Sequence, residues 1–166
     1  MKNISDVDFT KINFVLMDLD GVLTDGSIIY TDKGEQLKIF YAHDGHGIER
    51  GHNLGLKFGI ISGRKSAANN HRAERIKIEE LYQDCKDKVA AYEEIRTKYK
   101  LQPENFCFIG DDVFDMPLLD KVAFSCAPKN GIREVKDSVH YVTELEGGRG
   151  AVREVIDLIL KRQGKI

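Results

Sequence analysis

The sequence predicts an α/β fold built on a doubly wound, Rossmann-like parallel sheet. Short apolar runs alternate with segments of helical periodicity, which is typical of a parallel sheet with helices on both faces. The length of 166 residues, with 42% hydrophobic and 31% charged residues, suits one compact domain spanning residues 1–166. The runs expected to form strands are residues 12–17, 57–61, 80–83, 106–109, 123–125 and 139–142.

A β-hairpin is expected directly after the first strand. Residues 27–30 and 36–41 are rich in β-prone side chains, and the Thr31-Asp32-Lys33-Gly34 stretch between them is rich in turn formers. This pattern interrupts the alternation of strands and helices, so it predicts a hairpin over residues 27–41 that is inserted into the sheet fold.

Two apolar stripes at helical spacing predict helices with one buried face. They consist of Val89, Tyr92, Ile95 and Tyr99, and of Val152, Val155, Ile156, Ile159 and Leu160. A glycine-rich segment, residues 147–150, precedes the last helix, so residues 147–166 comprise this segment and a C-terminal helix. Composition alone leaves two interpretations of the segment open, a flexible linker and a functional loop.

Charge and composition exclude several classes of partner. The net charge of −2 provides no basic stripe for nucleic acid or for an anionic membrane. No apolar run is long enough to span a bilayer, and the first residues, MKNISDVDFTK, contain no hydrophobic signal core, so we expect a cytoplasmic protein. The three cysteines, Cys85, Cys107 and Cys126, lack metal-site spacing, which favours reduced packing thiols.

Acidic residues follow two of the predicted strands. Asp18 and Asp20 follow the first strand, and Asp111, Asp112 and Asp115 follow residues 106–109. The carboxyl ends of parallel strands share one edge of a sheet, so these acids are expected to meet there. Carboxylates suit Mg²⁺, although a single acid at a strand end is often a helix N-cap, which is the interpretation favoured for Asp112.

Phosphoryl transfer suits such a cluster. Within the Asp18 and Asp20 pair, one carboxylate could ligate magnesium and attack phosphorus while the other protonates the leaving oxygen. Ser62 and Gly63 follow the second strand of the predicted sheet, where a helix starting near Lys65 would assist phosphate binding. Lys88 could neutralise the phosphoryl group. Taken singly, Ser-Gly is usually a turn and such a lysine is usually solvated.

Together these residues resemble the motifs of the haloacid dehalogenase-like phosphatase superfamily. The motifs are matched in order by Asp18 with Asp20, Ser62, Lys88, and Asp111 with Asp115. The resemblance implies a haloacid dehalogenase-like fold and an aspartyl-phosphate mechanism with Mg²⁺ as cofactor. It also implies that Asp18 is the nucleophile and a metal ligand, and that Asp20 is the general acid/base and offers its backbone carbonyl to the metal. Asp111 would be the second metal carboxylate, and Asp115 and Asp112 would support the metal site. The phosphate ligands implied are Ser62, Gly63 and Lys88.

Within that superfamily the chain is similar to the 3-deoxy-D-manno-octulosonate 8-phosphate phosphatase family. The similar stretches are DLDGVLTDG (18–26), KIFYAHDGHGI (38–48), ISGRK (61–65), GDDVFDMPLL (110–119) and GGRGAVREVIDLIL (147–160). The resemblance implies hydrolysis of that sugar-acid phosphate to the free acid and phosphate, for lipopolysaccharide precursor synthesis. It also implies no large cap domain, and a homotetramer with hairpins in a central barrel and active sites at subunit interfaces. Asp84 stands where the family pattern has glycine.

The substrate contacts implied are Arg64, Asp44, Gly45 and Arg149, with Arg153 as a further contact from the tail. A guanidinium at Arg64 suits a sugar-acid carboxylate or its hydroxyls. For Arg149 and Arg153, the alternative interpretation is that the side chains are simply exposed to solvent. The glycine-rich segment would let the C-terminal region reach an adjacent site. Phosphatases of 2-keto-3-deoxynononate 9-phosphate or acylneuraminate 9-phosphate are the alternative assignment.

Two alternative hypotheses assign the chain to a different functional class. A phospho-receiver domain also combines clustered aspartates with Ser or Thr and Lys, but it carries its phosphoacceptor after the third strand. Here the acids return only downstream of Ser62 and Lys88. A non-catalytic scaffolding relative is the second hypothesis, and the complete set of motifs argues against it.

Overall fold

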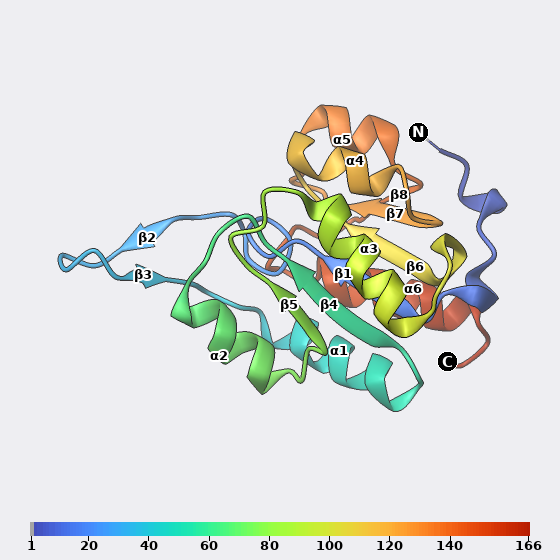
Figure 1. Ribbon diagram of the computed structural model, residues 1–166, viewed down its shortest axis with the longest axis horizontal. Helices are drawn as coiled ribbons and strands as arrows, with labels where there is room; N and C mark the ends of the chain where they lie inside the picture. The colour runs from blue at the N-terminus through green and yellow to red at the C-terminus, as the bar shows by residue number, and fades with distance from the viewer. Residues whose placement is uncertain (1) are drawn as a thin grey trace.

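The computed structural model describes residues 2–166 and is organised around a six-stranded parallel sheet (Figure 1). The sheet order is β5-β4-β1-β6-β7-β8, which places the first strand in the middle and reverses direction there, as in Rossmann-like folds. The predicted fold class is therefore confirmed. The strands are β1 (Phe14–Met17), β4 (Lys57–Ile61), β5 (Glu80–Tyr82), β6 (Phe106–Ile109), β7 (Phe124–Ala127) and β8 (Tyr141–Val142).

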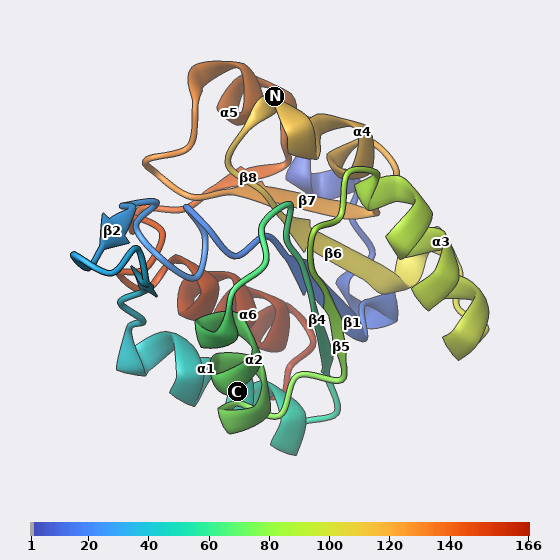
Figure 2. The same cartoon turned by 60° about the vertical axis from the view of Figure 1, so that its left-hand side comes forward.

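Helices cover both faces of the sheet (Figure 2). They are α1 (Ala42–Asn53), α2 (Ala67–Arg75), α3 (Lys88–Tyr99), α4 (Met116–Leu119), α5 (Arg133–Ser138) and α6 (Ala151–Arg162), with single 3-10 turns η1 (Ile4–Asp6), η2 (Phe9–Lys11), η3 (Pro103–Asn105) and η4 (Val113–Asp115). Helices α1, α2 and α6 contribute to one apolar cluster, and α3, α4 and α5 contribute to the other. Successive residues of β1 alternate between the two clusters, as expected for a strand buried on both faces.

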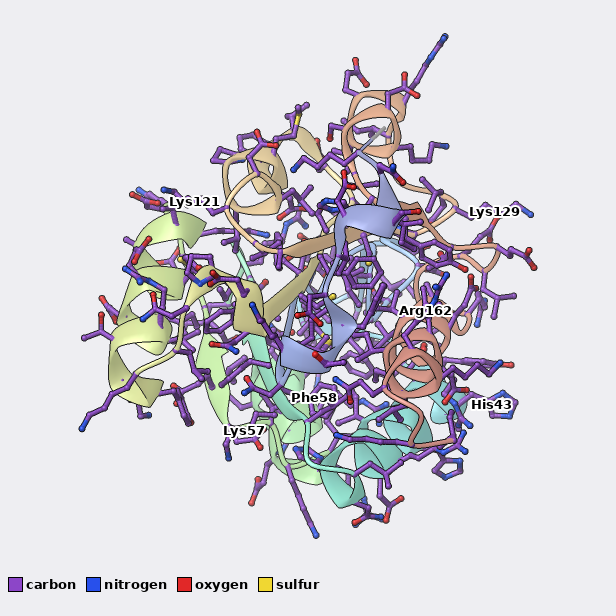
Figure 3. All side chains as sticks on the ribbon, turned by 90° about the vertical axis from the view of Figure 1, so that its right-hand side faces the viewer. His43, Lys57, Phe58, Lys121, Lys129 and Arg162 are labelled. Carbon is purple, nitrogen blue, oxygen red and sulfur yellow. The ribbon has the colours of Figure 1, made fainter. Side chains whose placement is uncertain are left out.

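The six predicted strands are confirmed, with shifted ends. Residues 12 and 13 lie outside β1 because η2 ends just before them, and β8 is limited to Tyr141–Val142. The two predicted apolar stripes lie in α3 and α6, where Ile95, Val155 and Ile159 are fully buried. Figure 3 shows the charged side chains of Lys121 and Lys129 pointing away from the body of the protein, whereas Phe58 lies inside it.

The inserted hairpin forms a separate two-stranded sheet that projects from the body of the protein (Figure 1). Its strands are β2 (Ile29–Tyr30) and β3 (Gln36–Leu37), paired antiparallel. The expectation that the second strand reaches residue 41 is wrong, because the chain leaves the ladder after Leu37 and Tyr41 already caps α1. The hairpin segment carries four exposed large apolar side chains, Ile28, Tyr30, Leu37 and Ile39.

Helix α1 was not anticipated because it lacks an apolar stripe. It buries two glycines instead: a Cβ atom at Gly47 would overlap Arg153 of α6, and one at Gly51 would overlap the ring of Phe58. The glycines let the α1 backbone approach α6 and β4 closely, although glycine weakens a helix on its own.

The side chain of Gln163, directly after α6, donates hydrogen bonds to the carbonyls of Phe9 and Ile12 at 2.9 and 2.7 Å.

Within the described residues, every helix is too short or too polar to cross a membrane.

Candidate active site

The site lies at the carboxyl ends of three adjacent strands. β1 pairs with β4 on one side and with β6 on the other, so the residues that follow these strands meet. Asp18, Ser62 and Asp111 are brought together in this way, and Lys88 joins them from the start of α3. They line an open pocket of about 520 Å³ together with Asp20, Gly26, Gly63, Arg64, Cys85, Lys86, Asp112, Phe114 and Asp115.

The loop after β1 depends on one glycine. The carbonyl of Leu19 accepts hydrogen bonds from the amides of Leu23 and Thr24 at 2.9 and 3.0 Å, which closes a tight turn. Gly21 has φ of +94° within this turn, in the region that disfavours side chains. A Cβ atom there would also overlap the carboxylate of Asp111. Gly21 therefore allows the two acid-bearing loops to approach each other.

The glycine-rich segment packs tightly against this loop. A Cβ atom at Gly147 would overlap the carbonyl oxygen of Gly21, and the amide of Gly148 donates to the carbonyl of Val22 at 2.9 Å. The amide of Gly147 donates to the side chain of Asn130 at 2.8 Å. The flexible-linker interpretation is therefore wrong: the segment belongs to the wall that supports the loop after Asp20.

Lys88 is the buried cation of the site. Its Nζ lies 2.6 Å from Oδ1 of Asp115 and 3.0 Å from Oδ1 of Asp18, and its side chain is only 9% exposed. Burial opposes the charge on the ammonium, but the carboxylates of Asp18 and Asp115 outweigh it and raise the pKa of Lys88. Lys88 is therefore held in its charged form, pointing into the pocket.

Negative charge exceeds positive charge around the carboxylates. Burial raises the pKa of Asp18 to about 6 against the opposing charge of Lys88. Burial, then the charges of Asp18 and Asp115, raise the pKa of Asp111 to about 8. Carboxylate oxygens of these three acids lie within 4.8 Å of one another. Oδ1 of Asp111 is buried without a hydrogen-bond partner among residues 2–166. This donor set fits a divalent cation that prefers oxygen ligands.

Asp115 has a different place in the cluster. Its Oδ1 accepts from Lys88 at 2.6 Å, and its Oδ2 accepts from the amides of Asp111 and Asp112 at 2.9 and 3.2 Å. Both oxygens are thus occupied by donors of the protein. Asp115 fits a residue that orients Lys88 and the Asp111 loop, and Asp18 and Asp111 are left as the carboxylates for a cation.

Ser62 and Gly63 line the same pocket from the end of β4. The Ser62 hydroxyl accepts from the amide of Arg64 at 3.2 Å, and Arg64 lies at the rim of the same pocket. Helix α2 begins at Ala67, slightly later than expected, and Ser66 caps it by accepting from the amide of Asn69 at 3.2 Å. The helix N-terminus therefore lies beyond Ser62 and Gly63 in the sequence.

Asp112 and Asp84 each lie in a turn near the site. Asp112 is the N-cap of η4, and its carboxylate accepts from the amide of Val113 at 2.6 Å, which confirms the capping interpretation. Asp84, at the position where the resemblance implies glycine, adopts φ of +53°. Aspartate tolerates this left-handed conformation better than most residues, so the glycine-like turn is retained.

The structure contradicts a direct substrate contact for Asp44. This carboxylate is fully buried and accepts from the amides of Gly150 and Arg153 at 3.3 and 2.9 Å. Burial raises the pKa of Asp44, and those two amides oppose the shift. Asp44 therefore fastens α1 to the start of α6, which also explains the Asp-Gly pair: Gly45 packs against the guanidinium of Arg72, outside the pocket.

The predicted contacts from the tail also lie outside the pocket. Arg149 reaches Asp25 at 3.6 Å and is half exposed, and Arg153 pairs with Asp157 at 2.6 Å along α6. Residues 147–166 pack on their own chain, and the expectation that this region also reaches an adjacent site stays a prediction. A contact of Arg149 with a neighbouring subunit stays a prediction.

Several pocket residues were missed by sequence reasoning. Phe114 is 79% exposed at the pocket, and Cys85 and Lys86 precede the helix that carries Lys88. Lys38 reaches Asp20 from the hairpin, with 2.6 Å between Nζ and Oδ1. The alternation of Leu37, Lys38 and Ile39 was the available signal, since a lysine between two outward apolar residues must point inward.

Comparisons with known proteins agree with this geometry. The sequence model of haloacid dehalogenase-like hydrolases matches residues 72–156. The 3-deoxy-D-manno-octulosonate 8-phosphate phosphatase of Yersinia pestis is 41% identical over 156 residues, covering 94% of this chain and 83% of that protein. Its crystal structure superposes with a TM-score of 0.93 at 40% identity, covering 98% of this chain and 86% of that one. The Moraxella catarrhalis phosphatase of the same name, in complex with magnesium, phosphate and the sugar acid, gives a TM-score of 0.91 at 36% identity, covering 94% and 90%.

Proposed function

Since the chain belongs to the haloacid dehalogenase-like hydrolase family, we propose that it is a magnesium-dependent phosphatase of 3-deoxy-D-manno-octulosonate 8-phosphate. The observation that carries the proposal is the convergence of Asp18, Asp111, Ser62 and Lys88 on one pocket. Relatives that bear this activity in their names cover nearly the whole chain at about 40% identity. The products are the free sugar acid and inorganic phosphate.

Each half of the reaction has a residue in place. The Asp18 carboxylate attacks phosphorus, and the bond to the leaving oxygen breaks while Asp20 gives that oxygen a proton. Water then attacks the aspartyl phosphate, Asp20 takes the proton from the water, and Asp18 is regenerated. Ser62, Gly63 and Lys88 hold the phosphoryl oxygens.

Asp18 and Asp111 would hold magnesium through their carboxylates, and Asp20 would add its backbone carbonyl. When bound, magnesium neutralises charge on the transferring phosphoryl group. Asp115 holds Lys88 and the Asp111 loop in position, and Asp112 caps the turn that follows. Chelation should abolish activity and added magnesium should restore it; activity that survives chelation would contradict this metal site.

The nucleophile has a direct test. Asp18→Asn retains the shape of the side chain but removes the attacking oxygen anion, so phosphate release should vanish while circular dichroism stays that of the wild type. A variant with full activity would refute the role of Asp18. Acetyl phosphate labelling without turnover of phosphomonoesters would instead support a phospho-receiver, and wild-type protein inactive on every phosphomonoester would support a scaffolding relative.

Substrate preference is proposed from the relatives and from Arg64. This side chain lies at the pocket rim, where its guanidinium suits the carboxylate or hydroxyls of a sugar acid. A panel of phosphorylated sugar acids, ranked by kcat/KM, tests the assignment. The eight-carbon acid should rank above 2-keto-3-deoxynononate 9-phosphate and acylneuraminate 9-phosphate, and the reverse order would transfer the chain to the nine-carbon group.

We also propose that four copies assemble through their hairpins, with active sites at the interfaces. The exposed apolar side chains of Ile28, Tyr30, Leu37 and Ile39 support this, because a projecting two-stranded hairpin is only marginally stable alone. Light scattering should give a tetramer, and Tyr30→Glu should dissociate it, whereas Lys33→Glu at the turn should not. A monomer with full activity would refute the proposal that the active sites lie at subunit interfaces.

We place the enzyme in the cytoplasm. The three cysteines are free thiols in the structure, and Cys107 and Cys126 are buried. Unpaired thiols suit a reducing compartment. Fractionation of the host cell, with the phosphatase activity followed in each fraction, tests this placement; recovery in the membrane fraction would contradict it.

A further inference from the structure

Asp20 has a buried partner outside the motifs that carry the proposed reaction. The Nζ of Lys38 lies 2.6 Å from Oδ1 of Asp20, and the Lys38 side chain is only 2% exposed. Lys38 stands 18 positions from Asp20, directly after β3 of the hairpin. The hairpin therefore delivers a cation to the proposed general acid/base.

The direction of Lys38 follows from strand geometry. In extended chain, successive side chains point to opposite sides. Leu37 and Ile39 are 52% and 55% exposed, whereas the Lys38 side chain between them is almost completely enclosed. Enclosing an ammonium is unfavourable unless an opposite charge compensates it. Asp20 is the one acid in ion-pair contact with Lys38 among residues 2–166, so the pair forms as a unit.

The two buried lysines serve different carboxylates. Lys88 contacts Asp18 and Asp115. Lys38 contacts Asp20 and neither of these. The second oxygen of Asp20, Oδ2, is buried and lacks a hydrogen-bond partner within the described chain. One oxygen of Asp20 is thus fixed by an ion pair, and the other is left to carry the proton.

We propose that Lys38 is a positioning residue for proton transfer, which fixes the orientation of the Asp20 carboxyl group. This inference rests on the proposed phosphatase function and assigns the hairpin a role inside the active site. Without the ammonium, no hydrogen bond among residues 2–166 would fix the rotation of the Asp20 carboxyl group. Misplacing a proton donor by about 1 Å is enough to cost about a hundredfold in rate.

The experiment uses leaving groups that differ in their need for a proton. Phenolate needs protonation as it departs, whereas 4-nitrophenolate leaves as a stable anion. In Lys38→Met, kcat/KM for phenyl phosphate should fall at least about tenfold, while kcat/KM for 4-nitrophenyl phosphate should change less than about threefold. Because kcat/KM covers the steps up to departure of the leaving group, the comparison isolates the first proton transfer.

Controls separate positioning from damage to the site. Lys33→Met removes an exposed lysine from the same hairpin and should resemble the wild type on both esters. Inhibition by inorganic phosphate reports the Ser62 and Lys88 region, and it should be unchanged in Lys38→Met. Lys38→Arg retains a cation and should recover part of the loss on phenyl phosphate.

Three results would overturn the inference. The first is an equal loss on both esters with weakened phosphate inhibition, which would show that Lys38 only maintains the structure. The second is unchanged kcat/KM on both esters. The third applies if Lys38→Met does not fold. In that case, a folded Lys38→Gln with wild-type kcat/KM for phenyl phosphate would overturn the inference. If the wild type releases phosphate neither from these esters nor from 3-deoxy-D-manno-octulosonate 8-phosphate, the proposed function fails instead, so the two failures are distinguishable.

Discussion

Replacing Asp111 with asparagine should stabilise the metal-free protein. Burial, then Asp18 and Asp115, raise the pKa of Asp111 from 3.8 to about 8. A carboxyl group whose pKa is raised on folding contributes stability below its unfolded pKa, and that stability is lost as pH rises through the folded pKa. At ~1.4 kcal/mol per pKa unit, retaining the proton on folded Asp111 at neutral pH, where the unfolded carboxyl group is ionised, costs at most about 4 kcal/mol. Solvent in the open pocket reduces this, and we expect a gain of about 2 kcal/mol.

The assay is urea unfolding with EDTA present, from about pH 5 to about pH 8. As pH rises across this range, the free energy of unfolding of the wild type should fall more steeply than that of Asp111→Asn. Adding magnesium should stabilise the wild type but not Asp111→Asn, because a ligand of the folded state adds to its stability. Asp112→Asn is the matched control, since it removes an adjacent exposed acid and retains a good N-cap. An Asp111→Asn variant less stable than the wild type in EDTA would refute the reasoning.

Three further predictions concern the wall of the site, the phosphate contacts and a distant histidine. Gly147→Ala should lower kcat at least about tenfold, because the added Cβ atom would displace the Gly21 carbonyl and the loop after Asp20. The rate of phosphate release measures this loss. Ser62→Ala should weaken inhibition by inorganic phosphate about tenfold, since it removes a charge-assisted hydrogen bond. Burial, then Lys2, lower the pKa of His140, so folding stability should fall as pH drops below about 6.5; thermal unfolding of wild type and His140→Asn measures it.

Each of these predictions has a contradicting outcome. A fully active Gly147→Ala would mean that the loop does not depend on the glycine-rich segment. Unchanged phosphate inhibition in Ser62→Ala would remove the hydroxyl from the phosphate site. For His140, Nδ1 accepts from the amide of Ser125 at 3.1 Å, which requires a neutral ring. A pH dependence identical in wild type and His140→Asn would show that this ring does not report on folding.

The sequence predicted the fold class because each central strand is continuously apolar and ends abruptly in polar residues. The same pattern placed Asp18, Ser62 and Asp111 at one edge, since adjacent parallel strands end together. Lys88 was also placed correctly at the start of its helix. These predictions needed only local patterns and the rule that parallel strands share an edge.

Predictions from the sequence failed where tertiary contacts, and not a periodic apolar pattern, determine the local structure. Helix α1 buries Gly47 and Gly51, so it has no apolar stripe to recognise. Asp44 follows the family pattern, but a linear motif does not tell whether a carboxylate faces a pocket or the backbone of another helix. Lys38 was overlooked because a lysine near a turn is usually solvated, and its partner lies far away in sequence.

The contact between Gly147 and Gly21 has a consequence for protein synthesis. The catalytic turn emerges from the ribosome long before its supporting glycine, because Gly147 lies far downstream of Gly21 in the sequence. A nascent chain that lacks residues 147–166 carries Asp18 and Asp20 without the wall behind them and without the amides that hold Asp44. Phosphatase activity should therefore arise only after residues 147–166 have been translated, so shorter nascent chains would not consume substrate.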